Sequence, residues 1–179
     1  IEKQDKRVKV MKRVRIQTGK VGLVFKKGDY QGIITQGSHW LGFNKHVLEY
    51  NMAAPFHATK PLEILLKDEA LAKMLTIVEV ADNELVLVYE NKNFKNVLTA
   101  GRYAFWKGLI DYKFITVDLS KLDITEKIDK TLFAKPELSK YVRVFEVLAY
   151  EKAIMIVDDE FVKTLERGTY RFWRNNKTV

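Results

Sequence analysis

The chain has 179 residues, of which 47% are apolar and 30% are charged, and its net charge is +8. This balance excludes intrinsic disorder, and no apolar run approaches the roughly 18–20 residues that a membrane-spanning helix requires. The sequence has no cysteine, which excludes disulfides, thiol nucleophiles and cysteine-ligated zinc, and fits a cytoplasmic location.

The positive charge is concentrated at the N-terminus. Residues 1–20 contain eight basic and two acidic residues, so this segment carries +6 and the rest of the chain +2. Four basic side chains would lie on one side of an extended strand: Arg7, Lys9, Arg13 and Arg15. They form either a solvated outer face or a contact for an anionic membrane surface or nucleic acid. Nucleic acid is disfavoured because no aromatic residue precedes Phe25.

The sequence contains an internal repeat. Residues 78–106 align without gaps with residues 145–173, and nine of the 29 positions are identical. Residues 14–42 align with the same block at an offset of 64, mainly in residue type. Ungapped spacing and agreement at glycine and aromatic positions favour triplication over chance. We therefore expect a mainly β (α+β) fold of three tandem hairpin-rich repeats with short connecting helices. The expected boundaries are a basic arm at 1–13 and repeats at 14–75, 76–141 and 142–179.

Each repeat should form its strands in the same order. A short alternating strand comes first, and an apolar strand follows it: VGLVFK, LVLVYE or AIMIVD. A polar tip at 27–29, 91–93 or 158–160 then closes a hairpin. The return strand runs from an aromatic residue to a glycine with positive φ, after which a last strand begins. These aromatic and glycine residues are Tyr30, Phe94, Phe161, Gly37, Gly101 and Gly168.

Alternation divides the last strand into two faces. We assign its tyrosine and phenylalanine face to the core: Tyr103, Phe105, Tyr170 and Phe172. Trp106 and Trp173 lie on the opposite face, where they would cap their own sheet, cover a neighbouring repeat or contact a partner chain. Trp40 is grouped with them as an interface residue.

Helical patterns occur only between the repeats. Residues 67–75 (KDEALAKML) are good helix formers with an acidic start, and residues 134–142 place Pro136 in a first helical turn. Residues 120–133 fit a strand followed by a helix less clearly.

No group of residues predicts catalysis or a cofactor. His39, His46 and His57 have spacings that match no standard zinc site, and His39 aligns with tyrosines at a core edge. The carboxylates of residues 158–160 occupy a hairpin tip, where a solvated turn is the simpler interpretation. Phosphate-binding and nucleophile motifs are absent from the sequence. We therefore expect a protein that is not an enzyme and that binds no cofactor or metal.

Two segments, ADNELVLVYENKNFKNVLTAGRYAFWKG and YEKAIMIVDDEFVKTLERGTYRFW, resemble the opening of band 7 (SPFH) proteins, the group of stomatin, prohibitin and slipin. Bacterial slipin-like proteins are the nearest in pattern, and repeats of the major vault protein have similar hairpins. The chain differs from the family at the residue before the glycine, which is Gln36, Ala100 or Arg167 instead of proline.

The resemblance implies a membrane-associated scaffold that forms oligomers. It also implies that the third repeat is the start of a band 7-like domain that extends past Val179. The expected function is therefore a structural module for self-assembly or protein docking, at a membrane surface if the basic arm contacts lipid. The alternative is a binding module for an anionic polymer, for which a steep salt dependence would be the sign.

Overall fold

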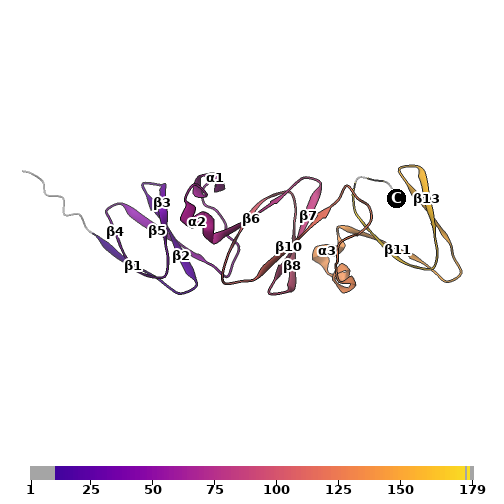
Figure 1. Ribbon diagram of the computed structural model, residues 1–179, viewed down its shortest axis with the longest axis horizontal. Helices are drawn as coiled ribbons and strands as arrows, with labels where there is room; N and C mark the ends of the chain where they lie inside the picture. The colour runs from indigo at the N-terminus through magenta and orange to yellow at the C-terminus, as the bar shows by residue number, and fades with distance from the viewer. Residues whose placement is uncertain (1–10, 176, 178–179) are drawn as a thin grey trace, which may run out of the picture. The chain divides into compact units, whose positions relative to one another are not determined.

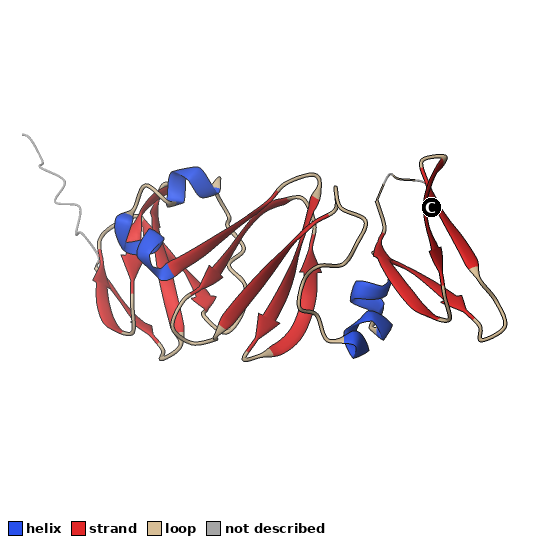
Figure 2. Cartoon of the chain, turned by 45° about the vertical axis from the view of Figure 1, so that its right-hand side comes forward, coloured by secondary structure: helices blue, strands red, loops and turns tan. Residues whose placement is uncertain are grey.

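The computed structural model describes residues 11–175 and residue 177, and these residues form a mainly β protein (Figures 1 and 2). The chain folds into two compact units. Unit 1 comprises the residues up to Val78 together with Tyr103–Asp111, and unit 2 comprises Glu79–Arg102 and the residues from Tyr112 onward. The boundary between the units falls within two paired strands, β6 (Leu75–Val80) and β9 (Gly101–Trp106).

Unit 1 contains a two-stranded ribbon, a three-stranded sheet and two short helices. The ribbon pairs β1 with β4 and the sheet has the order β3-β2-β5, with all pairs antiparallel. The elements are β1 (Lys12–Ile16), β2 (Lys20–Lys26), β3 (Asp29–Ile34), β4 (Gly37–Leu41), β5 (Lys45–Asn51), α1 (Leu62–Leu65) and α2 (Glu69–Met74).

Unit 2 contains a three-stranded sheet, a two-stranded ribbon, a separate hairpin and short helices. It has a sheet of order β10-β7-β8, a ribbon of β11 and β14, and a hairpin of β12 and β13. The elements are β7 (Glu84–Glu90), β8 (Asn93–Leu98), β10 (Tyr112–Asp118), a 3₁₀ helix (Lys130–Ala134), α3 (Pro136–Ser139), β11 (Val142–Val147), β12 (Ala153–Val157), β13 (Glu160–Leu165) and β14 (Gly168–Trp173).

The same pairings therefore occur in three stretches of chain, which we call block 1 (β1–β5), block 2 (β6–β10) and block 3 (β11–β14). Each has a ribbon and a hairpin, and blocks 1 and 2 add a third strand, β5 or β10, to the hairpin. The hairpins share a register shift at equivalent places, after Val24, Val88 and Met155. The descent of the blocks from one ancestral unit stays a prediction.

Each hairpin closes through a two-residue turn whose residues both have positive φ. The turns are Lys27–Gly28, Asn91–Lys92 and Asp158–Asp159, with φ between 48° and 91°. Both central residues of a type I′ turn need positive φ, and this turn matches the twist of the flanking strands. The third residue of each predicted tip already belongs to the return strand.

The glycines after the return strands have the conformation that the sequence predicts. Gly37, Gly101 and Gly168 have φ of 132°, 149° and 158°. In blocks 1 and 3 the side chain two residues later folds back over the glycine. His39 Nε2 lies 2.7 Å from the Thr35 carbonyl oxygen, and the Tyr170 hydroxyl donates to the Glu166 carbonyl at 2.8 Å. The glycine–aromatic motif is thus a hydrogen-bonded turn in these two blocks, and its positive φ is what favours glycine.

The central strand of unit 1 is buried on both sides. Leu23 and Phe25 of β2 enter the main core cluster on one side. On the other side a Cβ at Gly22 would lie only 2.6 Å from Val47 of β5 and 2.9 Å from Ile16 of β1. A continuous apolar sequence is typical of a strand covered on both faces, and β7 has the same burial.

Each unit has its own core. The main cluster of unit 1 comprises Val21, Leu23, Phe25, Phe56, Leu65, Leu71, Leu75, Ala104 and Trp106. The main cluster of unit 2 comprises Leu85, Leu87, Val117, Phe133, Leu138, Val142 and Trp173. A smaller cluster inside block 3 comprises Val147, Met155, Leu165 and Phe172. The short helices are held by these clusters, since helices of four to six residues are not stable alone.

The two predicted helices are confirmed within the expected ranges. Helix α2 starts after Asp68, whose side chain accepts a hydrogen bond from the Ala70 N–H at 2.9 Å, and α3 starts at Pro136. The expectation of a strand followed by a helix in residues 120–133 was wrong. The segment has an isolated bridge at Asp123 in place of the strand and a 3₁₀ helix in place of the α-helix.

Asp68 has a second role in unit 1. Its Oδ2 accepts a hydrogen bond from the Tyr30 hydroxyl at 2.7 Å, which ties the start of α2 to β3. Burial, followed by this hydrogen bond and the charge of Asp68, raises the pKa of Tyr30. Since the folded pKa lies above the unfolded value of about 10, the stabilisation is complete below pH 10 and is lost as the pH rises above it.

We therefore expect Tyr30→Phe to flatten the alkaline part of the stability profile. At neutral pH the free energy of unfolding of the variant should be about 0.5–1.5 kcal/mol lower than that of the wild type, because the variant lacks the hydrogen bond to Asp68. Its free energy of unfolding should then fall less steeply than that of the wild type above pH 10. Urea unfolding at several pH values between neutral and alkaline measures both effects. A slope equal to that of the wild type would contradict the assignment, and Tyr150→Phe, at an exposed position, is the matched control.

Candidate interaction surfaces

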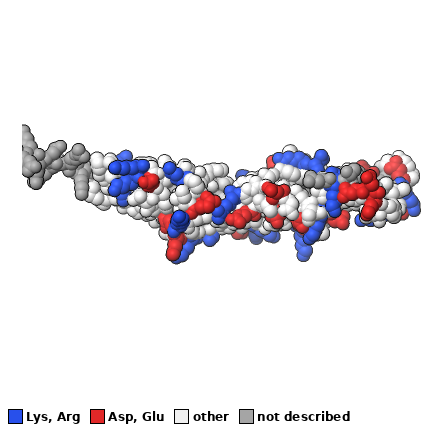
Figure 3. All heavy atoms as spheres, turned by 90° about the horizontal axis from the view of Figure 1, so that it is seen from above, with Lys and Arg blue, Asp and Glu red and all other residues white. Residues whose placement is uncertain are grey.

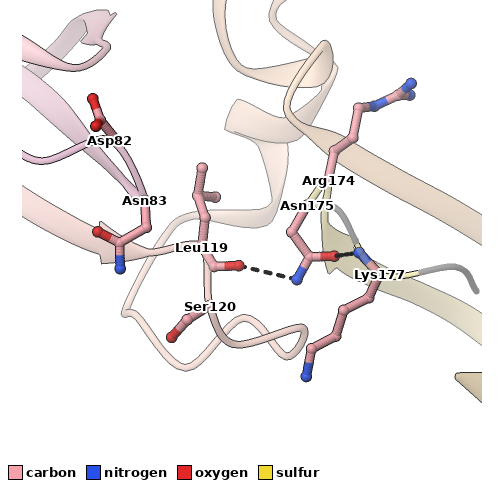
Figure 4. A pocket seen from close by; sticks show the side chains of 7 residues that line it. All are labelled: Asp82, Asn83, Leu119, Ser120, Arg174, Asn175 and Lys177. Atoms are coloured by element: carbon pink, nitrogen blue, oxygen red, sulfur yellow. Dashed lines mark hydrogen bonds between the residues drawn. The ribbon is translucent and has the colours of Figure 1, made fainter. Parts of the chain in front are cut away.

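An open hollow in unit 2 lies where β7 starts, β10 ends and the chain leaves β14 (Figure 4). Polar residues supply six of its seven lining positions: Asp82, Asn83, Leu119, Ser120, Arg174, Asn175 and Lys177. The Asn175 amide donates to the Leu119 carbonyl at 3.0 Å and accepts from the Lys177 N–H at 3.1 Å. Arg143 donates to the carbonyls of Asn175 and Lys177. These bonds fix the path of the chain after β14.

The histidines do not come together as a metal site. His39 takes part in the turn of block 1, and the ring of His46 stacks on Phe25 with 5.5 Å between ring centroids. Within residues 11–175 and residue 177, no three His, Cys, Asp or Glu side chains are grouped so that they could hold a metal ion.

Two of the three return-strand aromatics lie against their core, as predicted. Tyr30 packs edge-on against Phe25, and Phe94 packs edge-on against Tyr89 and lies under the Lys135 amine at 5.5 Å. The prediction for Phe161 was wrong, because this side chain is 65% exposed. Nothing covers the equivalent face of block 3 within the part of the chain that the structure describes.

The core assignment for the last strand is confirmed at Phe105 and Phe172, which are 3% and 4% exposed. Phe172 joins the small cluster inside block 3, with Tyr170 packed against it. Tyr103 is partly buried. On the opposite face Trp173 is also buried, Arg171 is half-buried and Thr169 is exposed, which the sequence did not settle.

Trp106 and Trp173 cover a neighbouring block. Both are at most 1% exposed, so of the three alternatives the structure contradicts contact with a partner chain and bears out cover of a neighbouring repeat. Trp106 of β9 lies in the cluster built on the sheet of block 1, with its ring 5.0 Å from Phe56. Trp173 of β14 lies in the cluster built on the sheet of block 2, and its indole N–H donates to Glu126 at 3.2 Å. Trp40, in contrast, is 64% exposed.

The described part of the basic segment is exposed on β1. Arg13 and Arg15 both lie at the surface, and Arg13 donates to the Ser38 hydroxyl at 3.2 Å. Arg7 and Lys9 lie outside the described residues. Figure 3 shows Lys and Arg side chains gathered on unit 1 with an acidic group beside them. The described surface therefore has a local basic patch.

The largest departure from the expected burial is in block 3. Its central strand β12 has the sequence AIMIV, as apolar as β2 and β7, yet Ile154 and Ile156 are 67% and 48% exposed. Register places Ile154 opposite Thr164 and Ile156 opposite Phe161, so these four residues share one face. We call this surface the tail face. Its equivalents in block 1 (Leu23, Phe25, Tyr30) and block 2 (Leu87, Tyr89, Phe94) belong to the two main clusters.

No family model, curated protein or solved structure matches the chain. The resemblance to band 7 proteins accordingly stays a prediction. Among the described residues, no helix has both the length and the apolar character to cross a membrane. The surfaces of the chain are therefore interpreted from their own geometry.

Proposed function

We propose that this chain is a non-catalytic scaffold module that self-associates through the tail face of block 3. The observation that carries the proposal is the exposure of three large apolar side chains on one sheet surface: Ile154, Ile156 and Phe161. Contiguous exposed apolar surface of this kind is typical of protein interaction sites.

Comparison of the blocks supports this interpretation. The equivalent surfaces of blocks 1 and 2 are covered by helices and by a tryptophan-bearing ribbon, and they form the cores of the two units. The tail face is built from the same kinds of side chain, so covering it would bury apolar area at about 25 cal/mol per Å². The open edge of β12, which pairs only with β13 in the described chain, offers backbone hydrogen bonds to the covering element as well.

The test is the light-scattering mass of the chain over a concentration series. The wild type should start near 20.9 kDa and rise with concentration. Ile154→Ser combined with Phe161→Ser should remain a monomer, because the variant loses the apolar centre of the surface. Ile64→Ser combined with Leu109→Ser removes similar exposed side chains elsewhere and should associate like the wild type. A wild type that stays monomeric throughout would overturn the proposal.

The alternative function, binding of an anionic membrane or polymer, depends on the basic segment. Arg13 and Arg15 are accessible for it, but half of the eight basic residues of the segment lie outside the described residues. This alternative stays a prediction, with nucleic acid disfavoured.

A further inference from the structure

The chain builds the same joint twice from its own elements. In unit 1 the ribbon of block 2 lies on the sheet of block 1, so that Leu75 and Trp106 share a cluster with Leu23 and Phe25. In unit 2 the ribbon of block 3 lies on the sheet of block 2, so that Val142 and Trp173 share a cluster with Leu87. One face of a ribbon is therefore the donor half of the joint, and the hairpin face of the preceding block is the acceptor half.

The ribbon of block 1 packs Ile16 against β2, but its outer face is a donor half that covers nothing in the described chain. Register pairs Arg13 with Trp40 and Arg15 with Ser38, so these four side chains share its outer face. Trp40 is 64% exposed, and Met11, which matches Leu75 when the offset of 64 is continued past the aligned block, is 57% exposed. We call this surface the head face. Trp40 lies two positions before the site equivalent to Trp106, on the same side of the strand.

The tail face is the matching acceptor half. Resting on the self-association proposed above, we infer that the head face of one copy docks on the tail face of the next, with Trp40 lying over Ile154, Ile156 and Phe161. The structure favours a second copy of the chain as the partner that covers the tail face. The chain itself twice covers an equivalent hairpin face with the ribbon of the next block. No helix of the described residues assists this joint as helices assist the two internal joints, so it should be weaker and reversible.

Charge favours contact between unlike ends over contact between like ends. The head face carries Arg13 and Arg15, and the tip of the block 3 hairpin carries Asp158, Asp159 and Glu160. Two tail faces brought together would place acidic tips near each other, and two head faces would do the same with arginines. Electrostatic complementarity of this kind selects the orientation of an encounter. A head-to-tail contact is heterologous, so it generates closed rings or open chains of copies.

The deciding experiment mixes two variants that each keep one end. Trp40→Ala has an intact tail and a damaged head, and Ile154→Ser with Phe161→Ser has an intact head and a damaged tail. Each alone should need at least about tenfold higher concentration than the wild type for half-association, as for loss of a central interface residue. An equimolar mixture should form a 1:1 dimer that grows no further, whereas the wild type forms longer species. The rescue in the mixture also shows that both variants are folded.

The outcomes separate this inference from the proposed function. If the wild type associates and Trp40→Ala associates equally well, the tail face pairs with itself and only the head-to-tail inference is overturned. If Trp40→Ala loses binding to phosphatidylserine vesicles while its self-association is unchanged, the head face serves a membrane and the inference is again overturned. If the wild type never associates, the proposed function is overturned and the inference goes with it.

Discussion

Replacing Trp173 with alanine should lower the free energy of unfolding of unit 2 by about 3–5 kcal/mol, the usual cost of truncating a buried aromatic side chain. The indole is fully buried, packs against Phe133 at 6.3 Å between ring centroids and donates to Glu126. It also joins β14 to the sheet of block 2 inside a single cluster. Its loss should therefore affect the docking of the ribbon as well as the local packing.

Urea unfolding followed by far-ultraviolet circular dichroism measures this effect without relying on tryptophan fluorescence. Trp40→Ala is the matched control, since its indole is exposed and the change should cost within about 0.5 kcal/mol. A loss at Trp173 no larger than the loss at Trp40 would show that the ribbon of block 3 does not pack on block 2 as described.

The second large effect is expected at Leu87, whose side chain has 0% exposure in the main cluster of unit 2. Leu87→Ala should cost about 2–5 kcal/mol. Ile154 occupies the equivalent place in block 3 but is 67% exposed, so Ile154→Ala in the monomer should cost about 1 kcal/mol or less. The two substitutions remove similar side chains from equivalent strands of one unit, and only the covering differs.

This pair is measured by urea unfolding at low protein concentration, and then again at high concentration. At high concentration the cost of Ile154→Ala should grow, because association stabilises the wild type by mass action. The cost of Leu87→Ala should be the same at both concentrations. A large effect of Ile154→Ala under dilute conditions would mean that the tail face is already covered within one chain.

Local patterns in the sequence predicted the parts of the fold that depend on neighbouring residues. The three hairpin tips and the glycines at 37, 101 and 168 were predicted because positive φ selects few residue types. The α2 helix was predicted from its formers and its acidic start. The strands β5 (KHVLEYN) and β10 (YKFITVD) were missed, because each pairs with a strand from which two other strands separate it in the sequence.

The candidate surfaces were harder to predict because they depend on what covers a strand. Alternation correctly separated Trp173 from Phe172 onto opposite faces, but it could not show that both side chains are buried. In the same way the sequence AIMIV indicates a strand buried on both sides. Only the fold shows that the side with Ile154 and Ile156 is exposed in the described chain. Trp40 aligns with no other tryptophan in the repeat alignment, so the alignment could not predict its exposure. The exposure comes from its position on the outer face of the first ribbon.

The two-residue turn at the end of β12 also bears on the solubility of the chain. An apolar strand with an open edge invites addition of strands from other chains, and segments of six or seven such residues are prone to amyloid-like stacking. β12 has five residues and is bracketed by Lys152, which pairs with Glu166 at 3.0 Å, and by Asp158 and Asp159 in the turn. These charges act as gatekeepers on both sides of the strand. They leave its face available to a shaped partner while opposing uncontrolled growth along its edge.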